Sequence, residues 1–227
     1  MPSCSAIGRG FGSHREQWTP RRLKAPLWFR ADLGVTLNGA TVSAWANQGT
    51  DAAGSLAQAT ADNQPTYTAV SSLGSRPALS FDTVNDVLTG SSANLAQPNF
   101  IALAVRTAAD VTTGNRGVVD GAIARHYVFA QDGSWKVFAG TVAVVGAAAN
   151  SANYALQCRV NGAASNARLN GSAWSGVLAV GPTALQSFQV SLVWGGPVGE
   201  VIVLDTMPSA LIEDRIHAYM RVRYGLW

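Results

Sequence analysis

The sequence predicts an all-β fold in which two antiparallel sheets pack into a β-sandwich, with an extended N-terminal arm and one C-terminal helix. Turn dipeptides recur between short apolar runs, charged side chains make up only 13 % of the chain, and only one stretch has a helical period. A length of 227 residues fits a single all-β domain of about 200–250 residues. Asn-Gly and Asp-Gly favour the type I′ turns that join antiparallel strands. These dipeptides occupy positions 38–39, 120–121, 132–133, 161–162 and 170–171.

The N-terminal segment, residues 1–24, is basic and lacks any strand or helix period. It contains five basic side chains and one acidic one, so residues 25–227 carry 11 basic and 12 acidic side chains. The segment is rich in Gly and Ser and poor in apolar groups. Burial of these few apolar groups cannot offset the conformational entropy that the segment would lose on becoming ordered. We therefore expect an arm at 1–24 that a partner holds, attached to a folded domain at 25–227.

The apolar runs of the domain have the length and alternation of strands. The first predicted strand is 26–30, and the run 99–106 is apolar on both faces, as expected for a central strand. Two predicted hairpins pair 126–131 with 134–139 and 154–160 with 164–169. The run 186–194 alternates, with Phe188, Val190, Leu192 and Trp194 on one face.

The predicted helix spans 209–223. Ile212, Ile216, Tyr219 and Met220 share one of its faces. Ser209 is the expected N-cap and Gly225 the expected stop. Many strands and a single terminal helix exclude a parallel α/β fold.

Several segments, in this order, resemble the concanavalin A-like or laminin-G-like domains of phage virion proteins and bacterial surface proteins. They cover residues 26–226 and leave the arm outside. The resemblance implies a lectin-like jelly roll, and it is poorly specific for function because this fold hosts lectins, glucanases and structural modules. The segments are 26–32, 42–48, 64–67, 76–82, 85–88, 199–204 and 219–226.

The residue pattern argues against catalysis. Glycosidases require two carboxylates flanking the scissile bond, and the chain has only three glutamates, at positions 16, 200 and 213. Glu200 and Asp205 share a strand, but a spacing of five places them on opposite faces. We expect no enzyme, no catalytic residue and no cofactor.

Metal ligands are also sparse. The three histidines at positions 14, 126 and 217 have no metal-ligand spacing, and His126 is expected to be a core or edge histidine. Asp82, Asn85 and Asp86 cluster in one loop, where they could hold Ca²⁺ or make only turn hydrogen bonds. The prediction for the whole chain is no metal site.

The tryptophans suggest a second class of function, sugar binding. Trp28, Trp45 and Trp194 lie in strand patterns and are predicted to be core. Trp135 and Trp174 lie beside turns and are the candidates for an exposed stacking surface.

Two functions follow. The first is a structural protein of a bacteriophage virion, a decoration, tail or fibre component that docks on capsid or tail proteins, or on another copy, through the arm. The second is a carbohydrate-binding module for host-surface glycans. No apolar run in residues 1–12 suggests a signal peptide and no stretch could span a membrane, so we expect synthesis in the host cytoplasm, no membrane partner and no nucleic-acid partner. The predicted docking residues are Ile7, Arg9, Phe11, Arg15, Trp18, Arg21 and Arg22.

Overall fold

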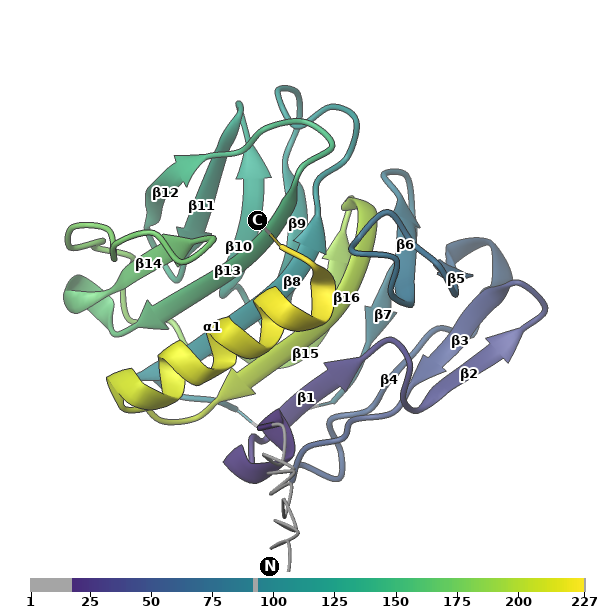
Figure 1. Ribbon diagram of the computed structural model, residues 1–227, viewed down its shortest axis with the longest axis horizontal. Helices are drawn as coiled ribbons and strands as arrows, with labels where there is room; N and C mark the ends of the chain where they lie inside the picture. The colour runs from purple at the N-terminus through teal and green to yellow at the C-terminus, as the bar shows by residue number, and fades with distance from the viewer. Residues whose placement is uncertain (1–17, 92–93, 227) are drawn as a thin grey trace, which may run out of the picture.

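The computed structural model describes residues 18–91 and 94–226, and these form an antiparallel β structure with one C-terminal helix (Figure 1). The helix is α1 (Ala210–Tyr224), and the short 3-10 helices are η1 (Pro20–Leu23), η2 (Ala61–Asn63) and η3 (Gly162–Ala164). The strands are β1 (Leu27–Arg30), β2 (Val35–Asn38), β3 (Thr41–Trp45), β4 (Leu56–Ala57), β5 (Thr66–Thr68), β6 (Ala78–Asp82), β7 (Leu88–Thr89), β8 (Asn99–Arg106), β9 (Arg116–Ala124), β10 (Tyr127–Gln131), β11 (Ser134–Phe138), β12 (Val142–Ala147), β13 (Asn153–Val160), β14 (Asn166–Leu169), β15 (Gln186–Leu192) and β16 (Gly195–Leu204).

The strands form one hydrogen-bonded path rather than two separate sheets. It runs β12-β11-β10-β9-β15-β7-β4-β3-β5-β6-β16-β8-β13-β14, while β1 pairs with β16 and β2 with β3. The short strands β7, β4 and β5 connect its two halves. The path curls until its ends come near each other, because residues of β12 and β14 have Cα atoms within 8 Å.

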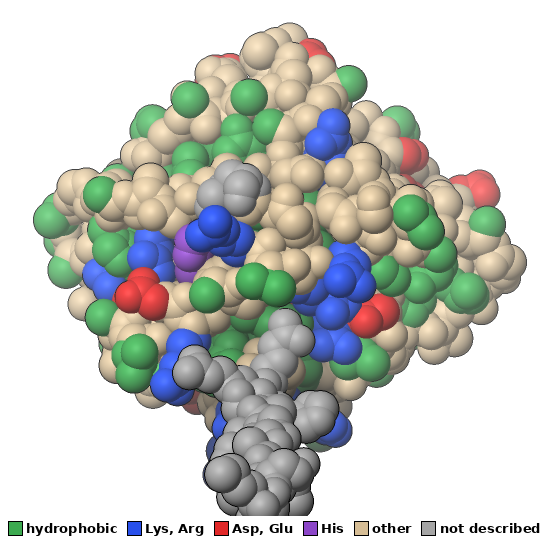
Figure 2. Space-filling view, viewed as in Figure 1, with side chains coloured by type: hydrophobic (Ala, Val, Ile, Leu, Met, Phe, Trp, Pro, Cys, Tyr) green, Lys and Arg blue, Asp and Glu red, His purple; other side chains and the backbone are tan. Residues whose placement is uncertain are grey.

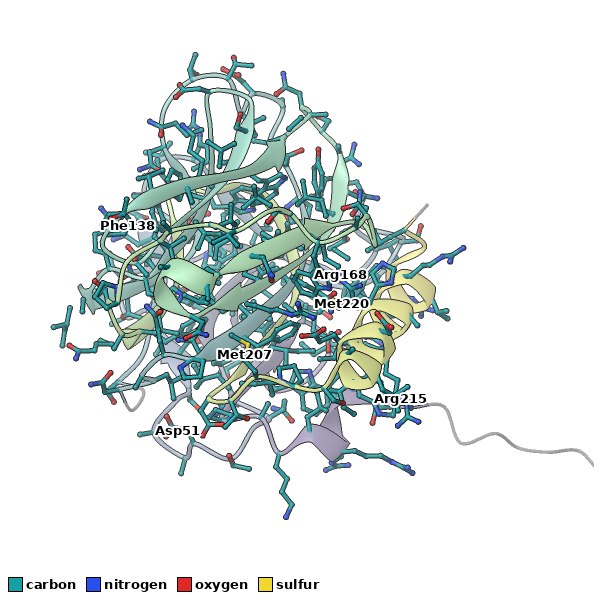
Figure 3. The ribbon with its side chains drawn as sticks, turned by 90° about the vertical axis from the view of Figure 1, so that its left-hand side faces the viewer. Asp51, Phe138, Arg168, Met207, Arg215 and Met220 are labelled. Carbon is teal, nitrogen blue, oxygen red and sulfur yellow. The ribbon has the colours of Figure 1, made fainter. Side chains whose placement is uncertain are left out.

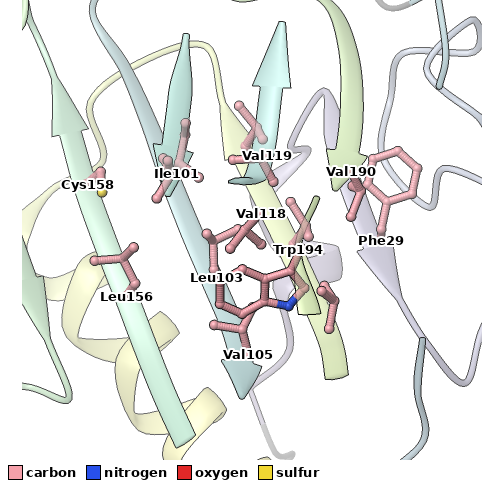
Figure 4. Packing of buried hydrophobic residues seen from close by; sticks show 14 of the residues in the cluster. Phe29, Ile101, Leu103, Val105, Val118, Val119, Leu156, Cys158, Val190 and Trp194 are labelled. Atoms are coloured by element: carbon pink, nitrogen blue, oxygen red, sulfur yellow. The ribbon is translucent and has the colours of Figure 1, made fainter. Parts of the chain in front are cut away.

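The inside of this curl is filled by one large apolar core to which both halves of the path contribute (Figure 4). The rings of Phe29 on β1 and Phe188 on β15 stack with centroids 5.7 Å apart. Trp135 on β11 and Trp194 beside β16 lie at the same centroid distance. Burial of these large side chains is the main favourable contribution to folding, at roughly 1.5–3 kcal/mol each.

A second apolar cluster fills the space between α1 and the outer face of β1, β8 and β16. Ile216, Tyr219 and Met220 of the helix pack there against Phe100 and Ile202. Helix α1 lies across β13 and β8 (Figure 1). Both faces of this half of the path are therefore covered, whereas α1 lies away from the outer face of β9, β10, β11 and β12. Figure 3 shows Met220 of α1 and Phe138 of β11 on opposite sides of the molecule.

The strand and turn predictions are largely confirmed. Strand β8 has the predicted bounds, and the two predicted hairpins are β10–β11 and β13–β14. Asp132 and Gly133 both have positive φ, 52° and 67°, as a type I′ turn requires. Asn170 and Gly171 also have positive φ, 50° and 70°.

The prediction of a turn at Asp120-Gly121 is wrong, since both residues lie within β9 and pair with Gln189 and Phe188. A β-carbon on Gly121 would lie 2.2 Å from the carbonyl oxygen of Ala124. The glycine is therefore needed for close backbone packing at an irregular part of the strand rather than for a turn.

The helix prediction is confirmed with a shift of one residue at each end. Ser209 occupies the N-cap position without a side-chain capping bond, and Gly225 ends the helix with φ 56°. Glu213 of α1 is buried and forms an ion pair with Arg159 of β13.

Candidate functional site

A groove on the outer face of β10, β11 and β12 is the candidate site. Its cavity has a volume of about 190 Å³. The floor is aromatic and aliphatic, and two polar side chains stand at one end. The lining residues are Asn115, Arg125, Tyr127, Phe129, Phe138 and Val142.

Strand alternation explains why aromatic rings gather on this face. On β10, Val128 and Ala130 point into the core, so Tyr127 and Phe129 lie on the opposite face of the strand, where their side chains are also buried. Their rings stack with centroids 4.5 Å apart and an interplanar angle of 12°. Tyr127 pairs directly with Phe138 of β11, which adds a third, half-exposed ring.

A glycine supports this arrangement from the neighbouring strand β9. A β-carbon on Gly117 would lie 2.0 Å from Cε2 of Tyr127, so the Tyr127 ring rests directly over the glycine backbone. Any larger residue at this position would displace the ring. The shape of the groove therefore depends on a residue without a side chain.

The polar end of the groove is fixed by hydrogen bonds and one ion pair. The Tyr127 hydroxyl donates to Oδ1 of Asn115 over 2.8 Å. The Arg125 guanidinium lies 4.5 Å from the Tyr127 ring centroid and forms an ion pair of 2.9 Å with Asp120. Asp120 is buried, and burial raises the pKa of its carboxyl against the opposing effect of Arg125.

This arrangement suits a ligand with an apolar face and polar edges. The half-buried ring of Phe138 and the exposed side chain of Val142 offer apolar contact, while Asn115 and the half-exposed Arg125 offer hydrogen-bonding groups at the rim. Binding sites for small molecules typically combine an apolar lining with a few placed polar groups.

The aromatic residues that the sequence favoured for such a surface do not form it. Trp135 is fully buried, since it alternates with Phe138 and points into the core; the prediction of exposure is wrong. Trp174 is half-buried, and the guanidinium groups of Arg159 and Arg168 lie 3.8 and 4.7 Å from its ring centroid. The three tryptophans predicted to be core are buried, namely Trp28, Trp45 and Trp194.

The loop at Asp82 uses its carboxylate for turn hydrogen bonds. Oδ1 accepts the backbone N–H groups of Val84, Asn85 and Asp86 over 2.8, 3.3 and 3.4 Å. Burial raises the pKa of Asp86 to about 6. Within residues 18–91 and 94–226, no group of three His, Cys, Asp or Glu side chains is placed to hold a metal ion.

His126 is a core histidine, as expected. It is fully buried, and neither ring nitrogen has a hydrogen-bond partner among the described residues. Burial lowers the pKa of the imidazole to about 4. The side chain is therefore neutral at physiological pH and serves as packing beside the groove residues Arg125 and Tyr127.

Of the predicted docking residues, Ile7, Arg9, Phe11 and Arg15 lie outside the described residues. Trp18 is half-buried, with its ring edge-on to Tyr219 of α1 at a centroid distance of 6.0 Å. Arg21 and Arg22 are exposed on η1, where Pro20 is buried. The docking role of these residues, and the domain boundary after residue 24, stay predictions.

No protein-family model matches the chain, and no curated protein matches it. The solved structures that are similar include domain 4 of AbnA, an extracellular arabinanase from Geobacillus stearothermophilus, in complex with arabinotriose. It is 12 % identical, with a TM-score of 0.52, and the match covers 79 % of this chain and 91 % of that domain.

A second similar structure is Trypanosoma rangeli sialidase in complex with 2,3-difluorosialic acid. It is 12 % identical, with a TM-score of 0.55 and 88 % of this chain covered. The chain spans about a third of the sialidase, 33 % of its length. At these identities the two matches show a shared β fold. Neither bears on the predicted virion role, which stays a prediction.

No helix in the described part of the chain has the length and apolar character needed to cross a membrane.

Proposed function

We propose that the chain is a carbohydrate-binding module that holds a saccharide in the groove over Tyr127, Phe129 and Phe138. The observation that carries this proposal is a groove on the sheet face that α1 leaves open, where the half-buried ring of Phe138 lies beside two hydrogen-bonding side chains and is supported by the buried rings of Tyr127 and Phe129. A sugar ring has one apolar face and a border of hydroxyl groups, which matches this pattern. The fold likeness to an arabinanase domain that binds arabinotriose supports the same ligand class.

The proposed mode of action is binding without catalysis. Glu200 is fully buried and accepts hydrogen bonds from Trp28, Tyr219 and Tyr224, so its carboxylate is not available to a ligand. Glu213 is equally buried and is paired with Arg159. The proposal treats the two halves of the single strand path as the two layers of a β-sandwich, with the groove on the outer face of the half that contains β10, β11 and β12. A virion-borne adhesin would use the groove in the same way.

A glycan array with the full-length chain, followed by calorimetric titration of the best ligand, tests the proposal. Full burial of an aromatic side chain contributes roughly 1.5–3 kcal/mol, so Phe138→Ala should weaken binding about tenfold or more. Phe138→Trp retains the flat apolar contact and should retain binding.

Tyr67→Ala serves as the matched control because Tyr67 is also half-buried but lies on β5, outside the groove. It should leave the affinity unchanged. An array without any bound glycan, or equal affinities for Phe138→Ala and the wild type, would overturn the proposal.

A further inference from the structure

A larger cleft opens on the side of the molecule that carries α1, where η1, β1 and the end of the helix meet. It has two compartments, of about 310 and 340 Å³, that share Thr19 and Arg30 in their walls. The first is lined by Thr19, Arg21, Trp28, Arg30, Leu33 and Gln48. The second is lined by Thr19, Arg30, Arg76, Tyr219, Val222 and Arg223. We call the two together the arginine cleft.

Four guanidinium groups from four separate segments converge on this cleft. They belong to Arg21 of η1, Arg30 of β1, Arg76 before β6 and Arg223 of α1. Figure 2 shows Lys and Arg side chains gathered beside an acidic side chain near the C-terminal end of α1. Convergence from such distant positions makes this a constructed feature of the tertiary fold rather than a local run of charge.

Two carboxylates compensate part of this positive charge. The carboxylate of Asp32 forms ion pairs with both Arg30 and Arg223, and the nitrogen-to-oxygen distance is 2.7 Å in each. Burial alone would raise the pKa of Asp32, but these two arginines lower it below its ordinary value. Glu200 lies 3.6 Å from Nε of Arg223, beneath the cleft.

The other two arginines have no acidic partner among the described residues. Arg76 uses Nε to donate to the carbonyl oxygen of Arg223 over 2.9 Å, and its side chain is exposed. Arg21 is exposed at the opposite wall. The cleft therefore carries four positive charges against at most two negative ones, and this excess favours an anionic ligand.

We propose that the arginine cleft binds a sugar acid, a saccharide ring that carries a carboxylate. The planar guanidinium fork matches a carboxylate in a bidentate arrangement. The hydroxyl group of Thr19 and the amide of Gln48 supply partners for ring hydroxyls, while Leu33 and Val222 supply apolar contact. This inference shares its broad ligand class with the proposed function but places the ligand at a separate site.

Calorimetric titration of the full-length chain with glucuronate tests the inference. Glucose serves as the neutral ligand of matched shape, and inorganic phosphate as the anion without a ring. We expect glucuronate to bind more tightly than either, with an affinity that falls as salt is added. Arg21→Gln and Arg76→Gln should each weaken glucuronate binding, up to about fivefold for an exposed charge pair.

Arg221→Gln is the control variant, because Arg221 is exposed on α1 and lines neither compartment. It removes the same charge and should leave the affinity unchanged. Glucose or phosphate binding as tightly as glucuronate would overturn the sugar-acid assignment. An equal loss of glucuronate affinity in Arg21→Gln, Arg76→Gln and Arg221→Gln would overturn the assignment of the ligand to the cleft.

Phe138→Ala separates this inference from the proposed function. If that variant abolishes glucuronate binding while Arg21→Gln and Arg76→Gln do not weaken it, the ligand occupies the groove and the cleft assignment fails alone. If the glycan array finds no ligand for the groove but glucuronate binding depends on Arg21 and Arg76, the proposed saccharide site in the groove is wrong and the proposed sugar-acid site in the cleft is supported.

Discussion

The indole N–H of Trp28 donates a hydrogen bond of 2.7 Å to Oε1 of Glu200, although 172 positions separate the two residues. The hydroxyl groups of Tyr219 and Tyr224 donate to the same carboxylate over 3.0–3.1 Å. One buried acidic side chain on β16 thus connects β1 to α1. Because the site excludes water, burial raises the pKa of Glu200 to about 7, against the opposing effects of Trp28 and Arg223.

Glu200 should make the stability of the fold depend on pH. Its carboxyl has an ordinary pKa of 4.5 and a folded pKa of about 7, so its contribution to folding is fully present below pH 4.5 and is lost as the pH rises to about 7. The loss amounts to about 3 kcal/mol. The Glu200→Gln variant cannot ionise at this position. Urea unfolding of both proteins should therefore show that the free energy of unfolding of the wild type falls relative to that of the variant as the pH rises from 4.5 to about 7. A constant difference in the free energy of unfolding would contradict the prediction.

His126 should produce the opposite slope. Its folded pKa of about 4 lies below the ordinary 6.5, so the contribution of the buried neutral imidazole is present above pH 6.5 and is lost as the pH falls to about 4. The loss is again about 3 kcal/mol. Relative to His126→Leu, the wild type should become less stable as the solution is acidified. If both proteins follow parallel curves, the imidazole is accessible to protons in the folded state.

The two effects overlap between pH 4.5 and 6.5, where they have opposite sign. The His126→Leu variant should therefore lose stability with rising pH in this range, whereas Glu200→Gln should gain it. The double variant should lack both contributions.

The parts of the fold that the sequence predicts well are those that local patterns determine. Strand β8 is apolar on both faces, and the β10–β11 hairpin surrounds a dipeptide that adopts positive φ at both positions. Asp120-Gly121 has the same turn chemistry but lies within β9, because Asp120 pairs with Arg125 and Gly121 is packed against the Ala124 backbone. Those contacts are tertiary, so the dipeptide alone cannot reveal them.

The candidate site was harder to predict for a similar reason. Residues 127–130 are apolar on both faces of the strand, so alternation separates Tyr127 and Phe129 from Val128 and Ala130 without showing which pair faces the core. The curl of the strand path decides this, since Val128 and Ala130 join the core that the curl encloses. The arginine cleft combines residues from positions 21 to 223, and no sequence window contains them together.

Shortening the N-terminus should separate packed residues from the rest of the predicted arm. Trp18 rests against Tyr219, and Pro20 is buried. Trp18→Ala should lower the free energy of unfolding by about 1 kcal/mol, since the ring is only half-buried. Removal of residues 1–17 should leave the thermal unfolding midpoint nearly unchanged. A shortened chain that fails to fold would show that residues before Trp18 belong to the domain.

Gly117 provides the sharpest structural test of the aromatic groove. A β-carbon at this position would lie 2.0 Å from Cε2 and 2.3 Å from the hydroxyl oxygen of Tyr127, so Gly117→Ala must displace the ring. Overpacking of this kind costs about 1–3 kcal/mol, and the displaced ring would also lose its hydrogen bond to Asn115. We expect the variant to remain folded, to unfold at lower urea concentration and to lose saccharide binding.

Gly176→Ala is the matched control for this substitution. A β-carbon on Gly176 would meet no atom within 4 Å, and its φ is not in the left-handed region. Stability should therefore change by less than about 0.5 kcal/mol, and binding should be retained. If Gly117→Ala binds the saccharide as well as Gly176→Ala does, the position of the Tyr127 ring has no part in recognition. The ligand would then have to contact the sheet away from this groove.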